Sequence, residues 1–222
     1  MKKELIVDRD PKSSLSEAIK NIRTNLQFSS VDGQVKNILV TSSTSSEGKS
    51  FISANLAVAF AKLGSNVLIV ACDMRLGRQH EIFSVSNKAG LSNLLIDDVD
   101  KNYSSYIQKT EIKNLSVLTR GIVPPNPSEL LASEKNRRLM EILKDKYDYI
   151  IWDGVPVIGL TDSVIMAPLV DKIVVVASYK RTPIELLKSS TDSLEKFKNK
   201  IAGVVVNGVP YKGNHYYTSS YM

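Results

Sequence analysis

The chain of 222 residues has a single cysteine, Cys72, and aromatic residues make up only 7% of it. One cysteine excludes an internal disulfide and is usual in a reducing compartment. Cys72 lies in an apolar run, so we expect it to be an inert core residue. No apolar run approaches the ~20 residues of a membrane-spanning helix, and the first ten residues lack the apolar region of a signal peptide. These absences predict a cytoplasmic protein.

Charge of one sign is also scarce, because the net charge is only +6 and the basic residues are spread along the chain. The short basic groups at residues 136–138 and 196–200 are explained by solvated helix faces. We therefore expect no nucleic-acid partner, while a mild attraction to an anionic membrane surface stays open. Hydrophobic residues make up 43% of the chain, which suits one α/β domain with a sizeable core.

Apolar runs of strand length alternate with helical patterns along the chain. This alternation is typical of a doubly wound, mainly parallel sheet with helices on both faces. We find no internal repeat and no sign of a second domain. The predicted strands cover residues 35–41, 67–71, 115–118, 147–152, 172–177 and 201–206. The predicted helices cover residues 13–29, 52–63, 91–96, 128–146 and 182–197.

The most informative segment is the loop between the first predicted strand and its helix, which contains Gly48-Lys49-Ser50. In that setting a Gly-Lys-Ser loop wraps a triphosphate with backbone N–H groups, aided by the N-terminus of the helix. We expect Lys49, on a solvent-facing loop, to neutralise the β- and γ-phosphates and the Ser50 hydroxyl to reach Mg²⁺. The sequence thus predicts a P-loop NTPase fold, although Ser43 stands where the first glycine is usual. The predicted ATP-binding residues of the loop are Ser45, Ser46, Glu47, Gly48, Lys49, Ser50 and Phe51.

Two carboxylates follow separate predicted strands. Asp73 lies just past the second strand, and Asp153 closes the fourth. Ligands of an open α/β sheet sit at the carboxyl ends of its strands, so both side chains should face the crevice of the loop. Mg²⁺ takes oxygen ligands, and one or two carboxylates with phosphate and water are usual. We therefore predict that Ser50, Asp73 and Asp153 hold the metal.

Several motifs resemble those of the bacterial tyrosine kinases, and the resemblance covers nearly the whole chain. Residues 68–75 resemble the second Walker motif of that family, residues 150–153 its Walker B motif, and residues 121–130 a proline-containing segment that it carries. Glu17, Lys20 and Arg23 resemble its oligomerisation motif, Glu-x-x-Arg-x-x-Arg, with Lys at the middle position. The tyrosines that resemble its autophosphorylation cluster are Tyr211, Tyr216, Tyr217 and Tyr221.

The resemblance implies three segments: a helical oligomerisation segment at residues 1–34, a kinase domain at 35–210 and a flexible, tyrosine-rich tail at 211–222. It implies an ATP-dependent tyrosine autokinase whose subunits form a ring and phosphorylate one another's tails. Within the family, the chain is similar to the separate kinase subunits of Gram-positive capsule and exopolysaccharide systems. It further implies a transmembrane activator of the polysaccharide co-polymerase type, a tyrosine phosphatase, and a place at the inner face of the cell membrane through the activator.

Carried over by position, the family's catalytic roles fall on Lys49, Asp73 and Asp153. The resemblance leaves two residues with open alternatives. Arg75 contacts phosphate or a neighbouring subunit, or else forms a structural ion pair. Asn207 faces the adenine, or else caps the end of the last strand.

The chain departs from the family pattern in ways that keep other functions open. The second Walker motif usually reads Asp-x-Asp, and here its first position is Ala71, two residues before Asp73 and expected to share a face with it. Ser45-Ser46 and residues 154–156 also differ from the usual residues. These changes permit a weakened kinase, an engineered variant or a nucleotide-binding scaffold. A partition ATPase carries a lysine where this chain has Thr44, which argues against that class.

Overall fold

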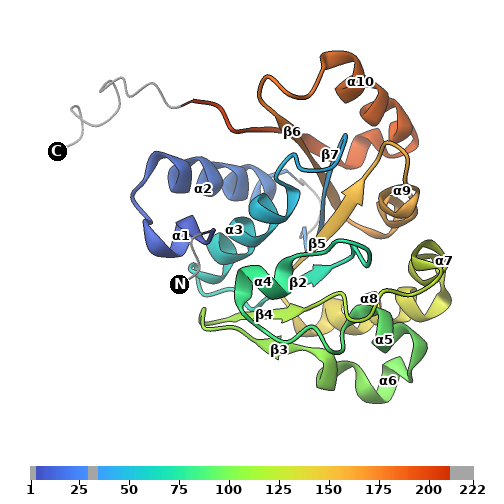
Figure 1. Cartoon of the computed structure of the whole chain (residues 1–222). Helices are drawn as coiled ribbons and strands as arrows, with labels where there is room; N and C mark the ends of the chain where they lie inside the picture. The colour runs from blue at the N-terminus through green and yellow to red at the C-terminus, as the bar shows by residue number, and fades with distance from the viewer. Residues whose placement is uncertain (1–3, 30–34, 211–222) are drawn as a thin grey trace.

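The computed structural model describes residues 4–29 and 35–210, and it is built on a seven-stranded sheet in the order β3-β4-β2-β5-β1-β6-β7 (Figure 1). Neighbouring strands pair in parallel, except that β3 is antiparallel to β4. The first strand, β1, lies inside the sheet and is buried along its whole length because both faces are covered. The strands are β1 Asn37–Ser42, β2 Val67–Ala71, β3 Gln108–Lys109, β4 Leu115–Leu118, β5 Tyr149–Pro156, β6 Lys172–Ser178 and β7 Ile201–Asn207.

Helices cover both faces of the sheet and divide the core in two (Figure 1). One face packs against α1 Ile6–Arg9, α2 Ser14–Gln27, α3 Lys49–Ala61 and α4 Gln79–Phe83. The other packs against α5 Leu91–Ile96, α6 Val99–Asn102, α7 Pro127–Ala132, α8 Glu134–Lys146, α9 Asp162–Met166 and α10 Ile184–Ser193. Short 3-10 turns at Tyr103–Tyr106, Ala167–Leu169 and Glu195–Lys200 join these elements. The predicted doubly wound α/β fold is confirmed.

Side chains along β2 point alternately into the two halves of the core. Val67 and Ile69 pack into the core under α3, whereas Leu68 and Val70 pack into the opposite core. Cys72 belongs to the second core and is 1% exposed, so the expectation of a buried residue is confirmed. Burial raises the pKa of its thiol well above the usual value, with smaller contributions from the nearby charges of Asp153, Asp162 and Asp73. The thiol is therefore held in its unreactive protonated form.

Three predicted boundaries were wrong. The helix expected over residues 128–146 is two helices, because Ser133 adopts an extended backbone conformation between α7 and α8. The fourth strand runs on to Pro156, so Asp153 lies within β5 and does not end it. The helix expected over residues 182–197 ends at Ser193, where a 3-10 turn follows. The short strand β3 and the helices α1, α4, α6 and α9 carry too little periodic sequence to have been predicted.

Ser133 ends one helix and begins the next. Its Oγ accepts a hydrogen bond from the Asn136 N–H at 3.2 Å and donates one to the Leu130 carbonyl at 2.6 Å. It thereby satisfies a donor at the start of α8 and an acceptor at the end of α7. The described helices include none that is long and apolar enough to cross a membrane.

We predict that Ser133→Ala lowers the free energy of unfolding by about 1 kcal/mol, the usual cost of losing an N-cap. Urea denaturation followed by circular dichroism measures this change. Ser133→Asp is the matched control, because it keeps a capping oxygen at the start of α8 and should lose less stability. Equal stability of all three proteins would show that the break between α7 and α8 does not depend on the cap.

Candidate active site

A crevice of about 580 Å³ opens at the carboxyl ends of the central strands, between the loop after β1 and the segment after β2. It brings the predicted loop residues and Asp73 to one place, as the sequence analysis expected. It also contains side chains that the sequence analysis did not single out, among them Arg78, His80 and Arg120. Its lining includes Ser45, Ser46, Gly48, Lys49, Ser50, Phe51, Asp73, Arg75, Leu76, Gly77, Arg78, His80, Glu81, Arg120, Pro156 and Leu160.

The loop backbone is wound tightly around the point where α3 begins. Ser46 and Gly48 both have positive φ, at 62° and 97°. A Cβ on Gly48 would lie 2.0 Å from the Asn207 side-chain nitrogen, so only glycine fits there. Asn207 donates to the Glu47 carbonyl oxygen at 3.0 Å and so supports the loop backbone from the end of β7. Its predicted contact with adenine stays a prediction.

Glu47 braces the loop with its side chain, which is only 3% exposed. The carboxylate accepts hydrogen bonds from the Thr44 N–H at 3.0 Å and from the Thr44 hydroxyl at 3.1 Å. It also accepts one from the hydroxyl of Thr182, which follows β6. With its side chain used in this way, Glu47 is available to a nucleotide through its backbone. Thr182 is a contributor that the sequence analysis missed, because nothing in its local pattern links it to a segment 135 residues away.

Asp153 is completely buried behind the loop, and its side chain points toward α3 and α4. Its Oδ1 lies 3.1 Å from the Ser53 hydroxyl, and its Oδ2 accepts a hydrogen bond of 2.8 Å from the Gln79 side chain. Burial raises the pKa of the Asp153 carboxyl, while the charge of Lys49 and hydrogen bonds from Gln79, Ser50 and Ser53 act in the opposite direction. Lys49 is itself 8% exposed, so the expectation that it faces solvent was wrong.

Asp73 lies in the tight turn that follows β2. Its Oδ1 accepts hydrogen bonds from the Arg75 N–H at 3.1 Å and the Leu76 N–H at 2.8 Å, which orients the carboxylate at the crevice. The Asp73 N–H donates to the Asp153 carbonyl oxygen at 3.2 Å. The backbones of the two acidic residues are thus joined directly, and their role at a metal stays a prediction.

Ala71 ends β2, is 1% exposed and pairs in register with Asp153 on β5. Register partners in a parallel sheet point their side chains to the same face. Ala71 therefore faces α3 beside Asp153. The chain turns directly after Ala71, since the Met74 N–H bonds to the Cys72 carbonyl at 2.9 Å. Asp73 therefore lies outside the strand. The alternation of side chains along β2, on which the predicted shared face of Ala71 and Asp73 relied, ends at Ala71.

Arg75 forms an ion pair with Asp162, which is 1% exposed at the start of α9. The Ser128 hydroxyl donates to the other Asp162 oxygen at 2.6 Å. The structural ion pair, one of the two alternatives for Arg75, is therefore present, and it ties the second Walker-like segment to the proline-containing segment. Asp162 was missed, although an acidic residue ahead of a short apolar run is a helix-start signal.

The residues predicted to form an oligomerisation motif lie on α2. Lys20 pairs with Glu17 at 2.7 Å and also donates to the Pro11 carbonyl. Arg23 turns the other way, and its guanidinium lies 3.3 Å from the Ala59 carbonyl in the last turn of α3. A structure of one copy shows these intramolecular contacts and leaves the ring interface a prediction. The four predicted phosphoacceptors, Tyr211, Tyr216, Tyr217 and Tyr221, lie outside the described residues.

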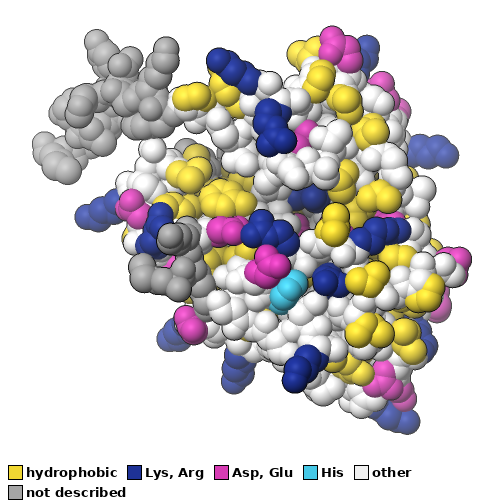
Figure 2. Space-filling model, viewed as in Figure 1, with side chains coloured by type: hydrophobic (Ala, Val, Ile, Leu, Met, Phe, Trp, Pro, Cys, Tyr) yellow, Lys and Arg dark blue, Asp and Glu magenta, His cyan; other side chains and the backbone are white. Residues whose placement is uncertain are grey.

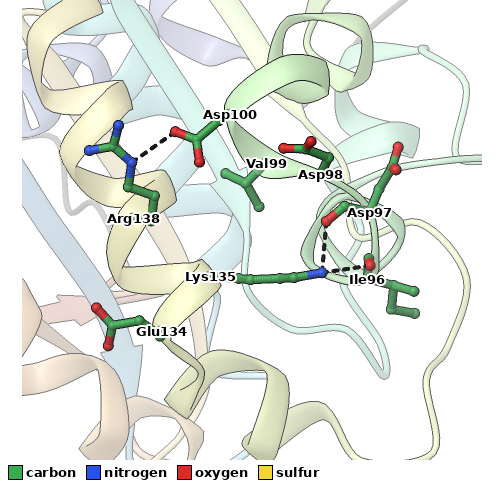
Figure 3. A pocket seen from close by; sticks show the side chains of 8 residues that line it. All are labelled: Ile96, Asp97, Asp98, Val99, Asp100, Glu134, Lys135 and Arg138. Carbon is green, nitrogen blue, oxygen red and sulfur yellow. Dashed lines mark hydrogen bonds and ion pairs between the residues drawn. The ribbon is translucent and has the colours of Figure 1, made fainter.

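A second hollow, remote from the loop, lies between the end of α5, α6 and α8 (Figure 3). Lys135 donates to the carbonyls of Ile96 and Asp97 at 2.7 and 2.8 Å, and Arg138 pairs with Asp100 at 2.8 Å. These contacts hold α8 against the α5–α6 turn, so the charges of this hollow have a structural role. On the face shown in Figure 2, Lys and Arg side chains are interspersed with Asp and Glu.

Phosphate and Mg²⁺ are the ligands to which the crevice is chemically suited. Hard oxygen donors, namely the Ser50 hydroxyl and the carboxylates of Asp73 and Asp153, lie with Lys49 at the N-terminus of α3. Within residues 4–29 and 35–210, no group of three or more His, Cys, Asp or Glu could hold a metal ion by itself.

Comparison with known proteins shows which family the chain is similar to. The model of the AAA domain matches residues 35–204. The putative tyrosine-protein kinase CapB of Staphylococcus aureus is 40% identical, over 96% of this chain and 92% of that protein.

Two solved structures of similar proteins also match the chain over most of its length. The crystal structure of the chimerical protein CapA2B2 is 39% identical with a TM-score of 0.88, covering 94% of this chain and 91% of that one. The kinase domain of the Escherichia coli tyrosine kinase ETK is 33% identical with a TM-score of 0.86, covering 95% and 82%. At this identity and coverage, the chain belongs to the bacterial tyrosine kinases.

Proposed function

We propose that the protein transfers the γ-phosphoryl group of ATP to tyrosines in the tail of a neighbouring subunit, Tyr211, Tyr216, Tyr217 and Tyr221. The observation that carries the proposal is the crevice itself, in which a glycine-lysine-serine loop at a helix N-terminus lies beside two carboxylates. In the transfer, the tyrosine oxygen bonds to the γ-phosphorus as the bond to the β,γ-bridging oxygen breaks and ADP leaves. The phenolic proton passes to solvent, because Asp73 and Asp153 are both assigned to the metal.

Each part of the site supports this chemistry. Phosphoryl transfer depends mainly on positioning and charge neutralisation. The loop N–H groups and the α3 N-terminus hold the phosphates, and Lys49 neutralises the charge that develops on them. Ser50, Asp73 and Asp153 would hold Mg²⁺, which when bound supplies positive charge to the phosphate oxygens. The hydrogen bonds from Thr44 and Thr182 to the buried Glu47 carboxylate support the shape of the loop.

We further propose that the kinase acts in capsule or exopolysaccharide synthesis at the inner face of the cell membrane. The support is the similarity to CapB over 92% of that protein's length and to the CapA2B2 chimera. A transmembrane activator, a tyrosine phosphatase and a ring of subunits belong to this proposal. The relatives named as kinases favour catalysis over the nucleotide-binding scaffold that Ala71 left open.

Lys49→Met should lower phosphotyrosine formation by at least about 100-fold, because it removes a charge that opposes the developing phosphate charge. Methionine fills a similar volume, so the fold should persist. Labelled ATP with Mg²⁺ and an antiphosphotyrosine blot measure the rate, and the melting temperature checks the fold. Lys62→Met, at an exposed lysine paired with Asp8, is the control and should keep the full rate. A normal rate in Lys49→Met would exclude this loop as the active site.

Ala71→Asp should raise autophosphorylation by about 10–100-fold and strengthen its response to Mg²⁺, the scale of effect typical of groups that orient a metal. The added carboxylate would stand beside Asp153 at the metal side of the crevice. Ala71→Asn is the matched control, because it has nearly the same shape without the charge. If Ala71→Asp is no faster than Ala71→Asn, the position serves packing alone.

The ring should dissociate when the tails are phosphorylated, since each phosphate adds about −1.5 to −2 charges. Light scattering of phosphorylated and unphosphorylated protein gives the two masses. Combined substitution of Glu17, Lys20 and Arg23 by alanine should leave a smaller assembly before phosphorylation. A surface ion pair contributes only ~0–1 kcal/mol, so a real interface must also include apolar neighbours on α2. Equal masses in both states would remove the ring model.

A further inference from the structure

Gln79, the first residue of α4, is completely buried against the candidate metal side of the crevice. Its side-chain nitrogen donates to Asp153 Oδ2 at 2.8 Å and lies 3.1 Å from the Ser50 carbonyl oxygen. One amide group thus joins three elements, namely α4, the first turn of α3 and strand β5. The two hydrogens of this nitrogen are both used, which fixes the direction of the amide.

The other end of the same amide is unsatisfied. Among the residues that the structure describes, none donates a hydrogen bond to Gln79 Oε1, although the atom is buried. A buried acceptor without a donor destabilises the folded protein, because it has lost its hydrogen bonds to water. Native proteins rarely keep such a group unless a ligand or an ordered solvent molecule completes it. Here the neighbours of the amide are Ser50 and Asp153, two residues proposed to hold the metal.

We propose that Gln79 is a positioning residue for the metal and nucleotide. Its nitrogen holds Asp153 Oδ2 in one orientation, and its Oε1 accepts a hydrogen bond from water in the site once Mg²⁺ and nucleotide are bound. The inference rests on the site proposed above. If this proposal is correct, replacing Gln79 changes metal-dependent nucleotide binding. If Gln79 served packing alone, its replacement would change only the stability of the fold.

Gln79 also lies close in sequence to Asp73, the second predicted carboxylate of the site. The segment after β2 that lines the crevice includes Asp73 and the two residues that flank Gln79, Arg78 and His80. The Asp73 N–H is tied to the Asp153 carbonyl, and Gln79 is tied to the Asp153 side chain. A Cβ on Gly77 would lie 2.4 Å from the Asp73 carbonyl oxygen, so the turn between them is closed tightly. Gln79 therefore fixes the wall that carries Asp73 relative to Asp153.

The test is the affinity for a fluorescent ADP analogue, measured with saturating Mg²⁺ and again with EDTA. The ratio of the two dissociation constants reports how much the metal contributes to binding. Gln79→Met keeps a similar volume but removes both polar ends of the side chain. We expect it to reduce the metal-dependent gain in affinity by about 10–100-fold, the usual effect of losing a group that orients a metal ligand. Affinity in EDTA should change much less.

Ile82→Ala is the matched control, because Ile82 lies on the same helix, is 4% exposed and packs into the core under α3. It should lower the melting temperature while leaving the ratio of affinities unchanged. A ratio in Gln79→Met equal to that in Ile82→Ala would overturn the role of Gln79 and leave the site assignment intact. If the unaltered protein shows no gain from Mg²⁺, the site assignment itself fails. The two failures are therefore distinguishable.

Discussion

The rest of the site depends on how a completely buried carboxylate, Asp153, is satisfied. A carboxylate that is removed from water needs hydrogen-bond donors from the protein. Without them, its burial lowers the stability of the fold by several kcal/mol. Here the donors come from α3 and α4, while the backbone carbonyl of the same residue receives the N–H groups of Cys72 and Asp73. The hydrogen bonds to Asp153 therefore hold three parts of the site in fixed relative positions: the helix after the phosphate loop, the segment after β2 and the central strand β5.

Parallel strands make this arrangement possible, because their carboxyl ends meet at one edge. The loop follows β1, Asp73 follows β2 and Asp153 lies near the end of β5, three neighbours in the sheet. Residues 100 positions apart in the sequence, Ser53 and Asp153, are thereby brought into contact. The chemistry needs few side chains, since the backbone of the loop and the N-terminus of α3 supply the remaining donors.

The sequence was sufficient for the fold class, most strands and the residues of the loop, because each depends on short-range patterns. It was not sufficient for Gln79, Thr182 or Asp162, whose roles come from contacts across the fold. The break at Ser133 was missed because residues on both sides favour a helix, and only the capping hydrogen bonds decide the boundary. Lys49 was expected in solvent because the packing of a loop against neighbouring elements leaves no local signal.

One hydrogen bond joins the phosphate loop to the end of the last described strand. Asn207 supports the loop backbone through the Glu47 carbonyl, and it is the last residue of β7. Only residues 208–210 separate it from the tyrosine-rich segment that begins at Tyr211. A displacement of the end of β7 would therefore move the side chain that supports the phosphate loop. The end of β7 and the shape of the phosphate loop are thus linked by a single amide group.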